Sequence, residues 1–237
     1  METPPGAPKQ RSPWVYVLIG CGGLAGLICL GTAIALFGLG KAVKDIGDGV
    51  NDPKERQANA LKQLGGIPEG YSVVASLSIF GLMQTTVLTD REALADGGFA
   101  MTADGHTFTY FRIVANDNNK KARDFFSGKD TDPNTLSQSG INIDAKDIVK
   151  RGQLTIDGRK LSWVASRGKL DTGGNGSAEG LNNAILFECP GDALQVGIWS
   201  QSDPAPEKTA EQLELAGTVA DEAEMARFLK PMNPCGK

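Results

Sequence analysis

The sequence predicts an α+β fold class: an N-terminal single transmembrane helix followed by an antiparallel sheet with packed helices. Three observations predict it. Residues 14–39 carry no charge, later segments alternate apolar and polar residues between turn sequences, and the C-terminal region contains helix-start signals. We therefore divide the chain into a disordered tail (1–13), a transmembrane helix (14–39), a juxtamembrane linker or helix (40–66) and a soluble α+β domain (67–237).

The apolar segment 14–39 is long enough to cross a bilayer, because as a helix it would measure roughly 39 Å against a hydrocarbon core of about 30 Å. Two alternatives are a lipoprotein signal ending at Cys21 and a signal peptide cleaved at Ala33-Ile34-Ala35. Both fit less well, since apolar residues continue beyond each cleavage site. We expect an uncleaved signal anchor that contacts membrane lipid through residues 14–39.

Small residues share one face of the predicted span. They are Gly22, Gly26, Cys29 and Ala33, at spacings of four, three and four. Such a face lets two helix backbones approach closely, so these residues are candidates for a homodimer contact.

Orientation depends on two opposing arguments. Lys9 and Arg11 precede the span, whereas four basic residues follow it: Lys41, Lys44, Lys54 and Arg56. Counted alone, these charges favour a cytoplasmic domain. A short basic tail before a long span is also typical of a signal anchor, and long domains translocate largely regardless of charge. We expect an extracytoplasmic domain, with a cytoplasm-facing anchor as the alternative.

Cys189 and Cys235 are the two cysteines outside the span. If the domain is exported they can pair, which would stabilise it by about 4 kcal/mol in the chain-entropy model. The alternative is a buried Cys189 and a free thiol at Cys235.

The juxtamembrane segment predicts one helix. Asp52 is a good N-cap, Pro53 a good first residue, and Gly65-Gly66 ends the helix. Because its apolar positions are sparse, we interpret this segment as a solvated spacer.

Strands begin the predicted domain. Residues 71–79 alternate apolar and polar side chains, Gly81 interrupts the pattern, and residues 82–90 continue in extended form. Residues 106–114 are rich in aromatic and β-branched residues and follow a turn at Asp104-Gly105, which indicates a hairpin.

The middle of the domain predicts a short helix over 117–128 and a flexible loop over 171–180. The other strands are predicted in two pairs: 152–156 with 160–166 around Asp157-Gly158, and 184–189 with 193–199 around Pro190-Gly191.

Two helices are predicted at the C-terminus. The first begins near Asp203-Pro204 and stops at Gly217, and the second begins at Thr218 with Asp221 at its third position. The apolar stripe of the second comprises Val219, Ala223, Ala226 and Leu229, with Met225 and Phe228 at its edges.

The order of these C-terminal elements resembles the PsbP-like α/β/α sandwich, named for an extrinsic subunit of photosystem II. The resemblance is carried by the segments TIDGRKLSWVAS, AILFECPGDALQVGIW and MARFLKPM, and it extends over residues 66–232 by element order, without a diagnostic motif. It implies a non-enzymatic accessory or binding module, and no functional residue is carried over.

Catalytic, cofactor and metal motifs are not recognised in the sequence. His106 is the only histidine, and its position after Gly105 is typical of an ordinary exposed turn residue. Ser166 and Lys169 satisfy S-x-x-K, the nucleophile motif of penicillin-interacting enzymes. That chemistry needs the serine at a helix start, whereas here it ends a predicted strand.

Net charge and motif content together favour a binding role. The chain has a net charge of −4 at pH 7 and no basic cluster in the domain, which argues against a nucleic-acid partner. We expect a membrane-anchored binding or assembly module that recognises a protein or an envelope component, without a cofactor. The alternatives are an anchored hydrolase with a site in the groove near residues 171–180, or a cytoplasm-facing structural or sensory anchor.

Overall fold

The computed structural model describes residues 52–79, 83–90, 105–114, 118–132, 135–138, 143–171 and 177–236. Within these ranges no helix is long and apolar enough to cross a membrane. The predicted span 14–39, with its small-residue face of Gly22, Gly26, Cys29 and Ala33, lies outside the described residues.

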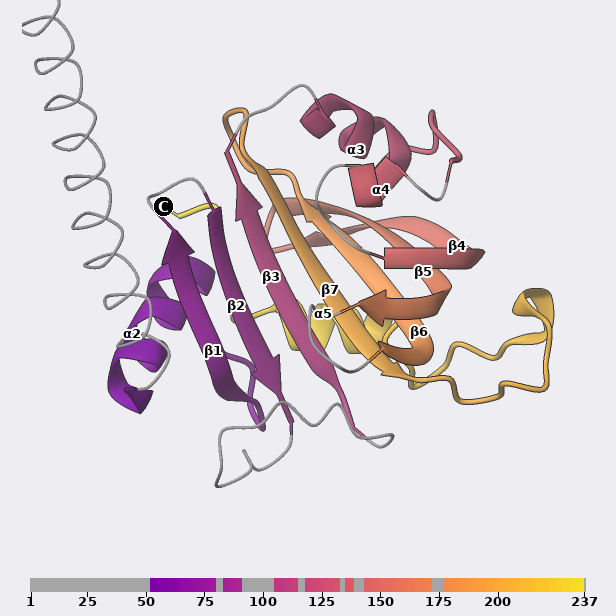
Figure 1. The fold of residues 1–237 in the computed structure, drawn as a ribbon, viewed down its shortest axis with the longest axis horizontal. Coiled ribbons are helices and arrows are strands. Elements are labelled where there is room, and N and C mark those ends of the chain that lie inside the picture. The colour runs from indigo at the N-terminus through magenta and orange to yellow at the C-terminus, as the bar shows by residue number, and fades with distance from the viewer. Residues whose placement is uncertain are drawn as a thin grey trace, which may run out of the picture. The chain divides into compact units, whose positions relative to one another are not determined.

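The described residues form a seven-stranded sheet in which all neighbouring strands run antiparallel, in the order β1-β2-β3-β7-β6-β5-β4 (Figure 1). The strands are β1 (Ser72–Ile79), β2 (Met83–Thr89), β3 (Thr107–Ile113), β4 (Ile143–Ile156), β5 (Arg159–Asp171), β6 (Ser177–Phe187) and β7 (Leu194–Ser202). The α+β class and the antiparallel sheet are therefore confirmed.

The turn between β4 and β5 follows the predicted Asp-Gly signal. Asp157 and Gly158 have φ angles of 51° and 79°, and this left-handed pair is the geometry that a tight two-residue hairpin requires. The strands on either side are longer than expected, because pairing between β5 and β6 continues to Asp171 and Ser177. The loop predicted over 171–180 is correspondingly shorter.

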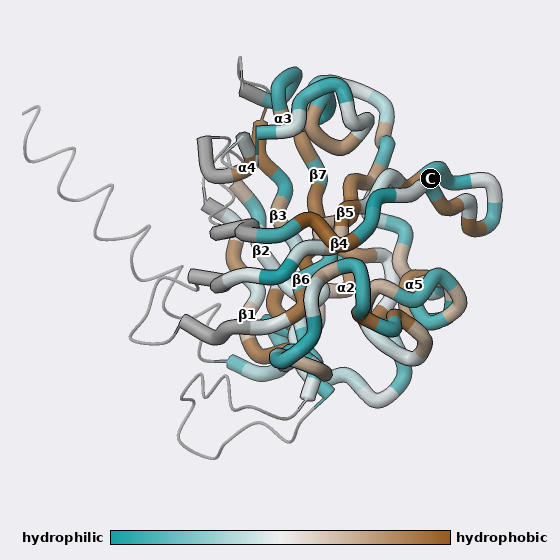
Figure 2. The backbone as a smooth tube through the Cα atoms, turned by 90° about the vertical axis from the view of Figure 1, so that its right-hand side faces the viewer, coloured by the Kyte–Doolittle hydropathy of each residue, from teal (hydrophilic) through white to brown (hydrophobic). Residues whose placement is uncertain are grey.

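Helices cover both faces of the sheet and bury two hydrophobic clusters. On one face, α2 (Pro53–Leu64) and α5 (Glu222–Leu229) bury the larger cluster. On the other face, α3 (Asn118–Phe126) and the short α4 (Thr135–Gln138) bury the smaller one. Figure 1 shows α5 behind the sheet, and Figure 2 shows the hydrophobic residues, in brown, concentrated along the strands.

Helix α2 is part of the domain core, which differs from the solvated spacer we expected. The predicted caps are correct: Asp52 accepts a hydrogen bond from the Lys54 amide, and Gly65 adopts the left-handed C-cap conformation. Ala60 and Leu64, however, are both 0% exposed. These two buried apolar side chains dock the helix on the sheet, although the sparse apolar pattern of the segment had indicated a solvated spacer.

Polar side chains of α2 also bind the edge strand β1. Arg56 donates to the Val74 carbonyl at 2.8 Å, and Gln63 donates to the Leu77 carbonyl at 3.1 Å. Gln63 in turn accepts from the Thr86 hydroxyl of β2 at 2.7 Å. These polar groups of the helix and strands thus bind one another, whereas Arg56 Nε has no hydrogen-bond partner among the described residues.

The segment after α5 is bonded both to the end of α2 and to Cys189. The Asn233 amide donates to the Leu64 carbonyl at 2.6 Å, and a Cβ at position 66 would lie 2.3 Å from the Pro231 carbonyl oxygen, so this crossing requires Gly66. Two residues after Asn233, the sulfurs of Cys189 and Cys235 lie 2.01 Å apart, a disulfide bond. The predicted pair is thus brought together, and closing this 46-residue separation stabilises the fold by about 4 kcal/mol in the chain-entropy model.

The prediction of a helix over 203–217 is wrong, because the helical structure in this segment is limited to the 3₁₀ turn η1 (Ala210–Gln212). Arg167 of β5 explains the difference. Its guanidinium pairs with Asp203 at 2.9 Å and donates to the carbonyls of Ala205 and Lys208, which holds the segment against the sheet in an irregular conformation.

The final helix begins later than predicted, at Glu222, with Asp221 as its N-cap. The Asp221 carboxylate accepts from the amides of Gly217 and Ala223, both at 2.8 Å, and these hydrogen bonds lower its pKa. The predicted stripe needs correction too. The buried helical residues are Met225, Phe228 and Leu229, whereas Ala223 is exposed.

Replacement of Leu64 by alanine tests the docking of α2. Leu64 is fully buried, so Leu64→Ala is expected to lower the free energy of unfolding by about 2–5 kcal/mol. Leu61 lies in the same helix but is 44% exposed, so Leu61→Ala is the matched control and should change stability by less than about 0.5 kcal/mol. Denaturant unfolding of the detergent-solubilised full chain gives both values. Equal effects would show that α2 does not dock.

Candidate functional site

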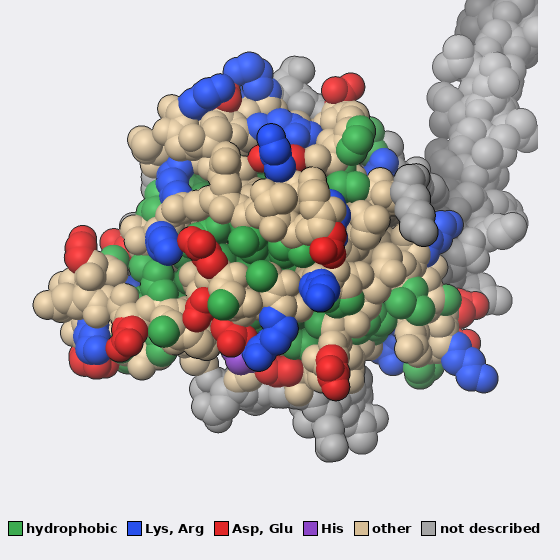
Figure 3. Space-filling view, turned by 180° about the vertical axis from the view of Figure 1, so that it is seen from behind, with side chains coloured by type: hydrophobic (Ala, Val, Ile, Leu, Met, Phe, Trp, Pro, Cys, Tyr) green, Lys and Arg blue, Asp and Glu red, His purple; other side chains and the backbone are tan. Residues whose placement is uncertain are grey.

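A pocket of about 1100 Å³ opens on the α5 face of the sheet. Its lining comes from the ends of β2, β3 and β7, the β4–β5 turn, the loop between α2 and β1, and α5 with its flanking loops. In Figure 3, which shows this face, hydrophobic side chains are exposed between acidic and basic ones, and the histidine lies at their margin. We expected a hydrolase site near residues 171–180, and none of the described residues there, 171 and 177–180, lines this pocket.

Strand register places three polar residues in one row at the pocket. Thr89 pairs with Thr107, and Thr107 pairs with Ser200. One step further along, Asp90, His106 and Gln201 therefore lie side by side across β2, β3 and β7. They point to the same face as the row of Leu88, Phe108 and Trp199, which belongs to the larger core cluster.

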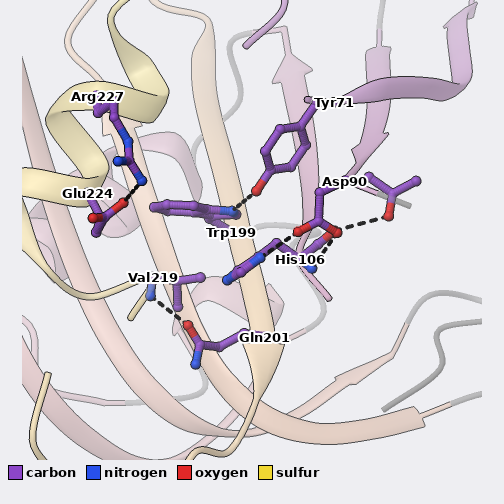
Figure 4. A network of polar contacts seen from close by, with 9 residues as sticks. Tyr71, Asp90, His106, Trp199, Gln201, Val219, Glu224 and Arg227 are labelled. Carbon is purple, nitrogen blue, oxygen red and sulfur yellow. Dashed lines mark hydrogen bonds and ion pairs between the residues drawn. The ribbon is translucent and has the colours of Figure 1, made fainter. Parts of the chain in front are cut away.

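Asp90 and His106 form a tightly bonded pair. The Asp90 carboxylate accepts from the His106 amide at 2.9 Å and lies 2.6 Å from His106 Nδ1. A carboxylate accepts a hydrogen bond from Nδ1–H, and in the tautomer that makes this bond the Nε2 atom carries the lone pair of the imidazole. Figure 4 shows the ring with Nε2 turned away from Asp90. The arrangement presents a fixed hydrogen-bond acceptor or general base.

Three aromatic rings form the wall beside this pair. Trp199 stacks on Phe228 of α5 at 4.2 Å between ring centroids, with the ring planes 6° apart. Tyr71 packs against the same Phe228 ring at 4.8 Å, and His106 lies 5.8 Å from Trp199. The His106 ring is thereby fixed between a carboxylate and an indole.

The Tyr71 hydroxyl is oriented by Trp199. The indole Nε1–H donates to the Tyr71 oxygen at 3.0 Å (Figure 4), so the hydroxyl proton must point elsewhere. Burial raises the pKa of this hydroxyl, which outweighs the opposite effect of the Trp199 hydrogen bond, and the Asp90 charge raises it further. Tyr71 therefore remains a protonated donor at neutral pH.

Side chains of the sheet hold the loop before α5 at the pocket edge. The Val219 amide donates to Gln201 Oε1 at 2.7 Å, and Asn183 donates to the Val219 carbonyl at 2.7 Å. Both backbone groups of Val219 are thus bonded to the sheet. This edge of the pocket is preorganised by contacts from β6 and β7.

The charged lining is acidic overall. Four carboxylates contribute to it, those of Glu69, Asp90, Asp157 and Glu224, against two basic side chains, Arg227 and Lys230. Two of the carboxylates already have basic partners: Glu224 forms an ion pair with Arg227 within α5, and Asp157 lies 3.6 Å from Arg159. A ligand with positive charge is favoured by such a lining.

We expected His106 to be an ordinary exposed turn residue; its side chain is 35% exposed, and it differs from an ordinary turn residue in its contact with Asp90. Ser166 of the S-x-x-K pattern is buried within β5, a strand rather than a helix start. Cys189 and Cys235 lie away from the pocket. Among the described residues, no group of three or more His, Cys, Asp or Glu side chains could hold a metal ion.

Sequence reasoning missed the pairing of Asp90 with His106, although the hairpin prediction contained the signal. Once β2 and β3 are paired, both residues lie one step beyond the ends of the strands. Tyr71 and Trp199 are 128 residues apart, and no local pattern could have joined them.

Comparison of the chain with protein-family models, with curated proteins and with solved structures finds no match.

The raised pKa of Tyr71 predicts a loss of stability at alkaline pH. The unfolded chain releases tyrosine protons near pH ~10, whereas the folded protein retains them to higher pH, so the free energy of unfolding falls as pH rises above ~10. In Tyr71→Phe this fall is expected to be smaller. Denaturant unfolding between about pH 9 and 11.5 measures it. Tyr16→Phe, in the predicted span, is the control, and a curve for Tyr71→Phe parallel to that of the unmodified protein would contradict the prediction.

Proposed function

We propose that the protein is a single-pass membrane-anchored binding or assembly module. Residues 14–39 are the tether, the C-terminal α+β domain is extracytoplasmic, and the pocket beside α5 is its binding site. The observation that carries this proposal is the pocket itself, in which oriented polar groups surround an aromatic wall.

The orientation of the pocket side chains supports binding. Asp90 holds the His106 ring, Trp199 holds the Tyr71 hydroxyl, and Gln201 holds the loop at Val219. Fixed groups bind a ligand with little loss of side-chain entropy, which favours affinity. The same contacts leave an acceptor at His106 and a donor at Tyr71 for a ligand.

The disulfide supports an extracytoplasmic domain. Bonds such as Cys189–Cys235 form and persist in oxidising compartments, whereas cytosolic thiols are usually kept reduced. Residues 40–52 alone separate the predicted span from the first residue of α2, and α2 is docked in the core.

A second candidate function is hydrolysis, which the Asp90–His106 pair specifically favours. A neutral imidazole whose Nδ1–H is bound by a carboxylate can accept a proton from water at Nε2. The described lining contains no serine or cysteine, and Thr218 donates its hydroxyl to the Leu215 carbonyl, so the nucleophile would be water. Binding is preferred because the described lining combines this pair with an aromatic wall and an oriented Tyr71 hydroxyl.

The state of the cysteines in living cells tests the location of the domain. Cells are quenched with a thiol-alkylating reagent before lysis, and the protein is compared on gels with and without reductant. An extracytoplasmic domain predicts that Cys189 and Cys235 resist alkylation until they are reduced. Cys189→Ser/Cys235→Ser is the control for the mobility shift. Full alkylation without reductant would favour the cytoplasm-facing anchor.

Photocrosslinking tests the binding site. A photoreactive amino acid at Glu69, on the pocket rim, is expected to form a discrete adduct in irradiated intact cells, whereas the same group at Lys121 on α3, on the other face of the sheet, should not. Both side chains are exposed, so the pair is matched in accessibility. Indistinguishable adduct patterns from the two positions would exclude the pocket as the binding site.

A further inference from the structure

We propose that His106 and Tyr71 form a two-point site for the main chain of an extended, positively charged polypeptide segment of the partner. This inference rests on the proposed binding function and names the chemistry of the ligand. His106 Nε2 would accept from a main-chain N–H, and the Tyr71 hydroxyl would donate to a main-chain carbonyl.

The acceptor follows from the contacts of His106. Both of its other polar groups on this side, the amide and Nδ1, bind Asp90, at 2.9 and 2.6 Å. The Thr89 hydroxyl occupies the His106 carbonyl at 3.0 Å. Among the contacts of the described residues, Nε2 is the polar group of this ring left for a ligand, and in the tautomer with the proton on Nδ1 it accepts from an N–H or O–H donor.

The donor follows from the contacts of Tyr71. Its oxygen accepts from Trp199 Nε1 at 3.0 Å, and Trp199 itself is only 5% exposed and stacked on Phe228. The indole cannot turn without breaking that stack, so the direction of the Tyr71 hydroxyl is maintained. The remaining proton of this hydroxyl selects an acceptor, of which a carbonyl oxygen is the commonest in proteins.

An extended polypeptide offers both groups in alternation. Its N–H and C=O groups recur along the chain, so one donor and one acceptor on the wall of the pocket can each find a partner. The pocket volume of about 1100 Å³ is above the usual range of small-ligand sites, about 300–1,000 Å³, and suits a chain segment that continues beyond the opening.

Charge selects which segment binds. Glu69 and Asp157 are exposed acidic residues of the lining; Asp157 lies 3.6 Å from Arg159, and Arg227 is paired with Glu224. A segment that carries Lys or Arg complements these carboxylates, and an acidic segment meets repulsion. The aromatic wall of Tyr71, Trp199 and Phe228 would pack against the apolar parts of a basic or an acidic segment alike, so it does not discriminate between them.

The single histidine provides a direct assay. Diethyl pyrocarbonate modifies neutral imidazole, and absorbance at the wavelength specific for carbethoxyhistidine then reports on His106 alone. The full chain in detergent micelles is treated in the presence of three probes: a pool of synthetic decapeptides with two lysines each, the same pool with glutamate in place of lysine, and chito-oligosaccharides.

The basic peptide pool is expected to protect His106 from modification, and the acidic pool and the oligosaccharides are not. Tyr71→Phe, which removes the donor, should weaken protection by about tenfold in peptide concentration. Lys121→Ala, distant from the pocket, is the control and should leave protection unchanged. Replacement of peptide amides by esters, which removes the N–H donors, should weaken protection to a similar degree.

Other results separate this inference from the function on which it rests. Protection by oligosaccharides but not by peptides would overturn the ligand class while leaving the pocket as a binding site. Adducts from Glu69 without protection of His106 by any probe would overturn the role of His106 and not the proposed function. Cleavage of the basic peptides, abolished in His106→Ala, would overturn the binding role in favour of hydrolysis.

Discussion

The packing of Phe228 against Trp199 and Tyr71 is the contact on which the rest of the domain depends. It fixes α5 on the sheet and completes the larger hydrophobic cluster, so it contributes to stability through burial of large aromatic surfaces. It also restrains the indole that orients the Tyr71 hydroxyl. One aromatic cluster therefore links the stability of the fold to the geometry of the proposed binding site.

Sheet elements were predictable because their signals are local. The alternation in 71–79 and the Asp157-Gly158 turn identify β1 and the β4–β5 hairpin without knowledge of their neighbours. The docking of α2 and the irregular segment after Asp203 depend on side chains distant in sequence, such as Gln63 with Thr86 and Arg167 with Ala205. The site depends on register, because Asp90 meets His106 only after β2 and β3 have paired. Local patterns contain neither kind of information.

Helix α2 has a second role at the edge of the sheet. An edge strand presents unpaired carbonyl and amide groups to which another strand can bind. The Val74 and Leu77 carbonyls of β1 instead accept from Arg56 and Gln63 of α2. The helix thus covers apolar surface and occupies hydrogen-bonding groups of the edge at once, which reduces the tendency of such a strand to pair with other chains.

The bond between the Asn233 amide and the Leu64 carbonyl joins the last residues of the chain to the first helix of the domain. A nascent chain cannot make this contact until Asn233 has been synthesised, because its two partners are separated by nearly the whole domain. Helix α2 therefore obtains this support only after Asn233 has emerged, and a polypeptide truncated before Asn233 would leave that helix end without its closing partner.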